Sequence, residues 1–311
     1  MSDAYQQALT GAVVFDHSDQ GKIIVAGPDA RAFLHNLSTN DIKNMKPGTC
    51  CEAFFATAQA KAVAYARIFF DASDDKEFFW LDLEPGQNQK VFTHLDRYIV
   101  SEQVELSDVT EDYCQWHVAG PGAEKVLEKP AIPASGSTRR CQRLNLPGWD
   151  VLCRRGDSQQ LLTLLTGNGA ILAGPEVFNV LRIEAGMPVY GIDIDENRFV
   201  VEVGRIKQAI SYTKGCYLGQ EPIVMARDRG HVNRTLLGLR VRADETLPPG
   251  TKLTRDDKVV GEVTSSEISP RLGTIGLAYI RRGNQEPGTL LQWTTDSRVG
   301  TAVVESFPFN V

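Results

Sequence analysis

The stretch KIIVAGPDARAFLHNL, residues 22–37, joins an apolar run to an amphipathic run through Gly-Pro. The same order returns in QWHVAGPGAEKVLEK (115–129) and, more weakly, in GAILAGPEVFNVLRIEAG (169–186). Proline is favoured at the first helical position, because its missing N–H would be unpaired there and its fixed φ suits a helix. The recurring strand-to-helix unit therefore predicts an α+β body built from related halves.

Other segments predict the rest of the architecture. Alternation over 61–70 and 76–83 indicates two strands, and NQKVFTHLDRYIV (88–100) has helical spacing. After about residue 235 short apolar runs alternate with Gly, Pro and Asp turns, which predicts a small antiparallel β-barrel. We therefore expect three regions: residues 1–110, residues 111–235, which carry a cysteine motif and can interleave with the first region, and residues 236–311.

Composition limits the classes of partner. The 311 residues carry a net charge of −6, with 42% hydrophobic and 23% charged residues, which argues against a general basic surface for nucleic acid or anionic membrane. The apolar runs are too short to cross a bilayer. The first twenty residues contain no Lys or Arg and no long apolar core, so we expect a cytoplasmic protein. Nothing in the sequence demands more than a monomer.

The six cysteines do not form a metal-binding pattern. None lies in a C-x-x-C pair, and the five histidines are not spaced with them as ligands. We therefore expect reduced thiols and no metal site held by the protein. Cys50 and Cys51 lie at the entry to a predicted strand and are interpreted as structural.

Glu184 is a candidate ligand-binding residue. In the helix predicted from Pro175 onward it shares one face with Val180 and Leu181, which places its carboxylate at the end of an apolar stripe. A buried carboxylate needs a partner. Glu184 is therefore either paired with an arginine, such as Arg182 or Arg205, or available to a heterocycle with adjacent N–H donors, such as a pterin.

Cys216 lies in an unusual setting, TKGCYLGQE (213–221), between two glycines. Glycines permit close approach of another molecule, and the positive charges of Lys214 and Arg227 favour a thiolate. His231 is the histidine nearest in sequence that could act as a base. Two interpretations remain open: a reactive thiol, or a half-buried cysteine at a tight turn.

These stretches also resemble a known family. KGCYLGQE (214–221), followed by RGHVNR (229–234), resembles the signature of the YgfZ-type folate-binding proteins, which belong to the superfamily of the glycine-cleavage T-protein, or aminomethyltransferase. LRIEAGMPVYGIDID (181–195) resembles the segment that the superfamily shares, and residues 25–48 resemble its N-terminal block. The resemblance covers essentially the whole chain, and the cysteine motif is its most specific part.

The resemblance implies a fold and a ligand. The fold would be three domains arranged like a cloverleaf around a central folate channel, with a C-terminal antiparallel β-barrel. The ligand would be tetrahydrofolate, with Glu184 matching the glutamate that contacts the pterin. Tyr65, Tyr190 and Arg227 are the other residues expected to contact the folate.

The resemblance also implies a function. The YgfZ-type branch assists the assembly or maintenance of iron–sulfur clusters in client enzymes, such as radical enzymes of tRNA modification. That function would depend on Cys216, with Lys214 beside it as the second catalytic candidate. No direct contact with nucleic acid or membrane is expected.

One departure distinguishes the branches. Aminomethyltransferases carry an Asp-Asp pair on a strand that aligns with residues 58–70, and here Ala64 and Tyr65 occupy those positions. Neither accepts a proton near neutral pH, because a tyrosine hydroxyl has a reference pKa of about 10. This argues against aminomethyl transfer. A folate-dependent one-carbon transferase and a non-catalytic binding module remain as alternatives, so whether the protein is an enzyme stays open.

Overall fold

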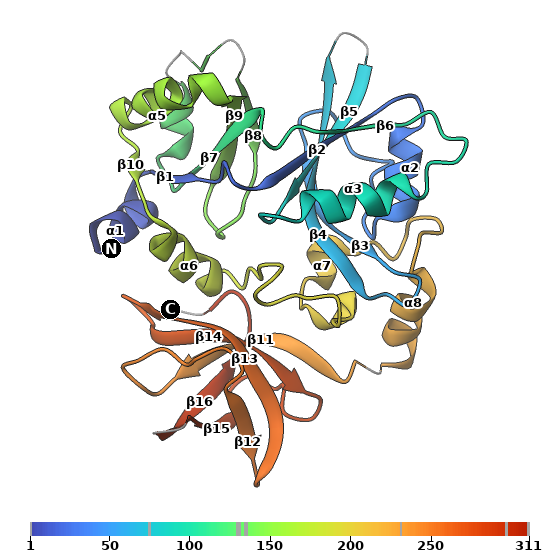
Figure 1. The fold of residues 1–311 in the computed structure, drawn as a ribbon. Coiled ribbons are helices and arrows are strands. Elements are labelled where there is room, and N and C mark those ends of the chain that lie inside the picture. Colours follow the sequence, from blue (N-terminus) through green and yellow to red (C-terminus); the bar gives the residue numbers. More distant parts are fainter. Residues whose placement is uncertain are drawn as a thin grey trace.

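The computed structural model describes residues 2–73, 76–128, 132–133, 136–230, 232–295 and 298–309. The chain forms three lobes around a shared centre (Figure 1). Two lobes each contain a five-stranded sheet with helices, and the third is a closed barrel. The predicted α+β fold with a C-terminal antiparallel barrel is therefore confirmed.

The first lobe is an antiparallel sheet whose strands differ in length, and two helices cover it. Its strands, in spatial order, are β3 (Cys50–Ala56), β4 (Ala62–Ser73), β5 (Lys76–Leu83), β2 (Gly21–Ala26) and β6 (Glu105–Asp108). The helices are α2 (Ala30–Leu37) and α3 (Asn88–Asp96). Apolar side chains on alternate positions of β3, β4 and β5 form one core with both helices, as the alternating pattern predicts.

The second lobe takes one inner strand of its sheet, β1, from the N-terminal part of the chain. Its sheet is ordered β10 (Ile171–Leu172), β1 (Val13–Asp16), β7 (Tyr113–Ala119), β9 (Gly148–Arg154) and β8 (Ser137–Arg140). Its helical elements are α1 (Ser2–Thr10), α4 (Ala123–Glu128), η1 (Arg155–Asp157), α5 (Ser158–Gly167) and α6 (Pro175–Glu184). Because β1 pairs with β7 in antiparallel register, the two lobes interleave along the chain.

The recurring Gly-Pro unit has the same backbone geometry in its first two copies. Gly27 after β2 and Gly120 after β7 have φ values of 112° and 117°. A Cβ atom would lie 2.2 Å from the carbonyl oxygen of Gln103 at the first position and 2.5 Å from that of Gly11 at the second. Both turns therefore require glycine.

The position of proline in the unit differs from the prediction. In the first two copies the helix begins two residues after the proline, at Ala30 and Ala123. The glycine turn and proline make the bend there, and the helix starts beyond it. Only in the third copy does proline open the helix, at Pro175 of α6.

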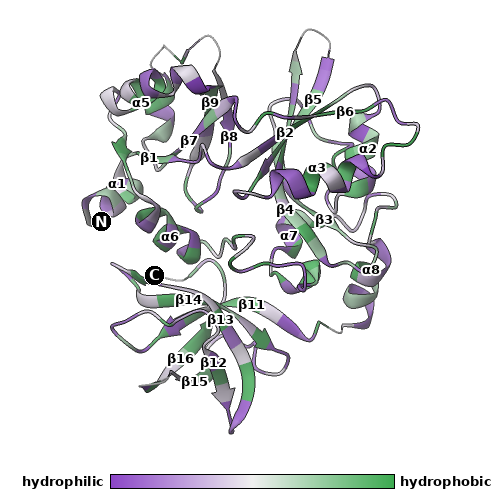
Figure 2. Cartoon of the chain, in the orientation of Figure 1, coloured by the Kyte–Doolittle hydropathy of each residue, from purple (hydrophilic) through white to green (hydrophobic). Residues whose placement is uncertain are grey.

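The third lobe is a six-stranded antiparallel barrel. Its strands, in order around the barrel, are β11 (Arg234–Val241), β14 (Gly273–Arg281), β13 (Lys258–Ser269), β12 (Lys252–Arg255), β15 (Leu290–Thr294) and β16 (Val299–Glu305). The described part of 234–309 contains no helix, as predicted. Figure 2 shows hydrophobic segments in all three lobes, which agrees with separate apolar cores for the two sheets and the barrel.

The connection from α6 to the barrel contains η2 (Val200–Glu202), α7 (Ile206–Ala209) and α8 (Gln220–Arg229). Together with parts of β3 and β4 it forms its own apolar cluster, which includes Phe54, Tyr65, Met187, Tyr190 and Tyr217. Across the described residues, no helix is both long and apolar enough to span a membrane.

A buried ion bridge joins the two sheets. Arg143, in the loop between β8 and β9, donates through Nη2 to Asp82 on β5 of the first lobe. The same guanidinium donates to both carboxylate oxygens of Asp150 on β9, at 3.2 Å from Nε and 2.8 Å from Nη2. All three side chains are almost fully buried. One cation therefore holds carboxylates from both lobes.

We expect Arg143→Leu to lower the free energy of unfolding by about 3–5 kcal/mol, because it leaves two carboxylates buried without their cation. Urea unfolding followed by circular dichroism measures this loss. Lys252→Ala is the control: Lys252 pairs with Glu262 in an exposed pair on the barrel, so its loss should cost less than about 1 kcal/mol. Equal effects of the two substitutions would contradict the bridging role of Arg143.

Candidate functional site

A cavity of 960 Å³ lies where the two α+β lobes meet the connection that follows α6. Its wall is formed by residues 15–20 at the end of β1, Glu84 and Pro85 after β5, the first turns of α6, and residues 189–192. Concave sites of this size, formed where lobes meet, are the usual place for a small-molecule ligand. We therefore take this cavity as the candidate binding site.

Aromatic rings form one wall of the cavity. The ring of Phe178 on α6 meets that of His17 edge-on, with 4.7 Å between their centroids, and lies 5.3 Å from that of Phe15. His17 in turn stacks on His117 at 5.7 Å. Such a wall suits a flat, ring-shaped ligand.

Two side chains that line this cavity each carry a buried polar atom with no hydrogen-bond partner among the described residues. The atoms are Nδ1 of His17 and Oε1 of Gln20. Leaving a buried polar atom unpaired costs about 1–3 kcal/mol, so it is rare without a functional reason. Burial also holds the pKa of His17 well below its usual value, so the ring is neutral and one nitrogen can accept a hydrogen bond. A ligand with N–H donors would satisfy both atoms.

Tyr190 and Arg182, which also line the cavity, are held in place by hydrogen bonds. The Tyr190 hydroxyl donates to the carbonyl oxygen of Ala62 at 3.1 Å and accepts from Lys90 Nζ at 2.9 Å. Arg182 is held by Asp193 at 2.9 Å. Burial raises the pKa of the nearby Glu84 carboxyl above its usual range. The wall therefore contains two side chains held in place by hydrogen bonds within the protein, together with a carboxyl group whose pKa is raised.

A second, smaller cavity of 310 Å³ lies where all three lobes meet. Its wall includes Glu52 of β3, Arg143, Met187, Arg205 and Phe307 near the C-terminus. The Arg205 guanidinium donates a hydrogen bond to the Glu52 carboxylate, with Nη2 at 2.6 Å from Oε1.

Tyr65 of β4 hydrogen-bonds to two of the residues that line this second cavity. Its hydroxyl donates to Glu52 and accepts from Arg205 Nε at 3.3 Å. Burial, together with the negative charge of Glu52, raises the pKa of Tyr65, so its hydroxyl stays protonated. It shares an apolar cluster with Tyr190 but is not among the residues that line the 960 Å³ cavity.

The carboxylate of Glu184 is paired within the protein, and its contact with a pterin stays a prediction. Its carboxylate accepts hydrogen bonds from Tyr5 (2.7 Å), Ser269 (2.5 Å) and Arg271 (Nη2, 2.6 Å). It does not line either cavity described above. The alternative of an internal ion pair applies, with Arg271 of the barrel in place of Arg182 or Arg205. The residue thus fastens α6 to the barrel.

Lys214 positions the cysteine loop. Its ammonium donates to three carbonyl oxygens in the last turn of α2 and just after it: that of His35, that of Ser38 at 2.7 Å and that of Asn40 at 2.7 Å. Burial lowers the pKa of Lys214 to about 8. Because its donors are used in this way, Lys214 anchors the loop to the first lobe, whereas the sequence suggested a charge directed at the thiol.

Cys216 is exposed on the loop between α7 and α8. The next residue, Tyr217, is buried in the cluster that contains Tyr65 and Tyr190. Arg227, on the exposed surface of α8, pairs with Asp228 at 2.6 Å. Its guanidinium lies over the ring of Tyr212 in the same loop. The predicted site residues therefore do not converge on one point: Tyr190 lines the large cavity, and Cys216 lies outside it. His231 lies outside the described residues.

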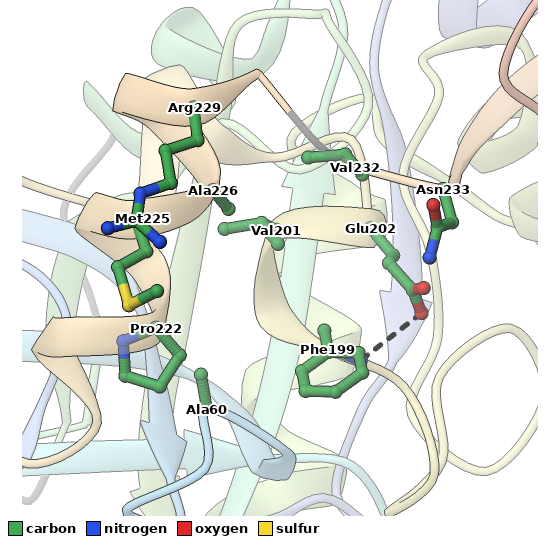
Figure 3. A pocket seen from close by; sticks show the side chains of 10 residues that line it. All are labelled: Ala60, Phe199, Val201, Glu202, Pro222, Met225, Ala226, Arg229, Val232 and Asn233. Carbon is green, nitrogen blue, oxygen red and sulfur yellow. Dashed lines mark hydrogen bonds between the residues drawn. The ribbon is translucent and has the colours of Figure 1, made fainter.

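A third concavity, of 560 Å³, runs along α8 (Figure 3). Figure 3 shows Pro222, Met225 and Ala226 of α8 facing Val201 and Phe199 across it. Its wall is mostly apolar, and α8 begins four residues after Cys216. The exposed thiol and the helix that forms one wall of this groove are therefore close in sequence.

His17 and Gln20 were not predicted as site residues. They belong to DHSDQG (16–21), a short polar loop between two apolar strands. A histidine in such a loop is a weak signal, because loops of this composition are usually solvated turns. Among the described residues, no group of three or more His, Cys, Asp or Glu side chains could hold a metal ion.

Family models match both ends of the chain. The GCVT N-terminal domain matches residues 2–141, and the glycine cleavage T-protein C-terminal barrel domain matches residues 234–310. A crystal structure of the glycine cleavage system aminomethyltransferase T from Bartonella henselae superimposes with a TM-score of 0.90 at 20% identity, covering 99% of this chain and 89% of that one. The chain belongs to the superfamily of the glycine-cleavage T-protein.

Curated relatives match most of this chain, and the chain spans about two thirds to nine tenths of their length. A chloroplastic protein of Arabidopsis thaliana, whose name describes it as a transferase, is 28% identical over 88% of this chain and 66% of its own length. The aminomethyltransferase of Rubrobacter xylanophilus is 28% identical over 89% of this chain and 78% of its own. That of a Parafrankia species is 29% identical over 98% and 88%.

We expect acidification to destabilise the protein in part through His17. The folded protein keeps this ring neutral, whereas the unfolded chain binds a proton below about pH 6.5, so stability falls as the pH drops through that value. One such histidine contributes up to about 1.4 kcal/mol per pH unit. His17→Phe keeps an aromatic ring and should make the fall in unfolding free energy between pH 7.5 and 5.5 less steep. Parallel pH profiles for variant and wild type would contradict this.

Proposed function

We propose that the protein binds a reduced folate with the pterin in the 960 Å³ cavity. The observation that carries this is the pair of unpartnered buried acceptors, His17 Nδ1 and Gln20 Oε1, in an aromatic-walled cavity. A pterin presents a flat ring with several adjacent N–H donors, which matches that wall and those acceptors. Membership of the T-protein superfamily supports the same ligand.

One-carbon transfer is the activity that the relatives support. Several relatives that span most of this chain are named aminomethyltransferases. When bound, a reduced folate supplies the nitrogen that accepts or donates the one-carbon unit. The protein's own role is to orient the ring through His17 and Gln20 and to exclude water. Glu84 is the carboxyl at the cavity whose pKa burial raises above its usual range, which makes it the candidate proton donor or acceptor.

A second candidate function is favoured by Cys216. This thiol is exposed, its loop is anchored by Lys214, and no acid occupies the Ala64–Tyr65 positions of β4. These features fit an accessory factor for iron–sulfur client enzymes of the YgfZ type, in which folate binding and an exposed cysteine act together. The clients would include radical enzymes of tRNA modification.

Folate binding is tested by Gln20→Leu. We expect tetrahydrofolate affinity to fall about 10-fold or more, since the ligand loses a buried hydrogen bond. The stability of the unliganded protein should stay level or rise, because an unpaired buried acceptor is removed. Isothermal titration calorimetry and urea unfolding measure the two effects, with Gln89→Leu on the exposed face of α3 as the control. Unchanged affinity in Gln20→Leu would refute this placement of the pterin.

The two functions are separated by Cys216→Ser. A transferase should transfer a one-carbon unit to tetrahydrofolate equally well in wild type and variant, because the thiol lies outside the cavity. An accessory factor should keep tetrahydrofolate affinity yet fail to restore client-enzyme activity in cells depleted of the protein. Single-turnover assays and complementation give the two readouts. Full complementation by the variant would exclude the cysteine-dependent role.

A further inference from the structure

Two cysteines from different lobes lie against each other at the seam between the sheets. Cys50 opens β3 of the first lobe, and Cys141 directly follows β8 of the second. Cys50 Sγ lies 3.5 Å from the carbonyl oxygen of Arg140, the residue before Cys141. Both side chains belong to one apolar cluster with Phe69, among others, and each thiol shifts the pKa of the other.

The two thiols have different environments. Cys50 is half-buried, so a small molecule can reach it, whereas Cys141 is 1% exposed. Interaction with the Cys141 thiol lowers the pKa of Cys50, and the positive charges of Arg67 and Arg143 act in the same direction. Burial raises the pKa of Cys141 well above its usual value. Cys50 is therefore the attacking thiol of the pair and Cys141 the resolving thiol.

We propose that Cys50 and Cys141 form a reversible disulfide across the two lobes, with a small-molecule disulfide such as oxidised glutathione as the oxidant. The Cys50 thiolate attacks one sulfur of glutathione disulfide, which breaks its S–S bond and releases one reduced glutathione. The Cys141 thiol then loses its proton and attacks Cys50 Sγ, which releases the second glutathione. Two electrons and two protons pass from the cysteines to the oxidant.

The bond would act on the small central cavity. Glu52 lies two residues after Cys50 and Arg143 two residues after Cys141, and both line the 310 Å³ cavity. A disulfide brings its two sulfur atoms to about 2.05 Å, which is shorter than any hydrogen-bonded contact. Closing the pair therefore draws the 140–143 segment towards β3 and narrows the cavity between them. This inference does not depend on folate binding.

The pairing is tested on the full chain by oxidation with glutathione disulfide, followed by non-reducing peptide mapping with mass spectrometry. A Cys51→Ser background removes the neighbouring thiol, which shares a peptide with Cys50. We expect a Cys50–Cys141 cross-link with loss of two hydrogens. In Cys51→Ser/Cys141→Ser the reaction should stop at Cys50 linked to one glutathione. A map with Cys50 and Cys141 both free, or with Cys50 joined to Cys51 in the wild type, would overturn the proposal.

Stability provides a second readout. The cross-link closes a long loop, so the oxidised protein should unfold several degrees higher than the reduced protein. Cys141→Ser should abolish this difference, and Cys216→Ser, which removes the exposed thiol of the loop before α8, should retain it. The same shift in Cys141→Ser as in wild type would show that oxidation stabilises the protein at another place and would refute the pair.

Discussion

The relative placement of the two sheets depends on one buried guanidinium. Arg143 leaves the second lobe and donates to Asp82 of the first lobe and Asp150 of its own. Asp150 also accepts from His117, which stacks on His17 at the wall of the large cavity. The ion bridge, the stacked histidines and the cavity wall are therefore one connected polar layer. A change in the bridge would move the wall that we assign to the ligand.

The sequence patterns predicted the architecture better than they predicted the candidate site. Alternating polarity predicted β4 and β5, and the turn-rich C-terminal segment predicted the barrel. The repeated Gly-Pro unit predicted two related lobes. These features depend on local periodicity and on backbone geometry, as at Gly27 and Gly120, where a side chain would meet a carbonyl oxygen. Pairing of β1 with β7 depends instead on contacts far apart along the chain, which no local pattern specifies.

The site residues show the same limit. The helical spacing of α6 predicted that Glu184 is buried, and the structure shows that it is. Its partner, Arg271, lies in the barrel, and no sequence pattern links Arg271 to Glu184. The spacing of Lys214 and Cys216 suggested that the two side chains interact directly. In the structure the Lys214 ammonium instead donates to carbonyl oxygens of another segment. His17 and Gln20 became candidates only when their surroundings showed that each has an unpaired buried atom. Burial without a partner is a property of the folded chain.

The placement of β1 also has a consequence for synthesis. This strand leaves the ribosome well before β7, yet Val13 pairs with Ala119 and Asp16 with Trp116. The nascent chain must therefore keep an apolar edge unpaired until β7 has been translated, while the first lobe can already close behind it. Such a segment is a natural substrate for a chaperone, and early termination of translation before β7 would leave a product prone to aggregation.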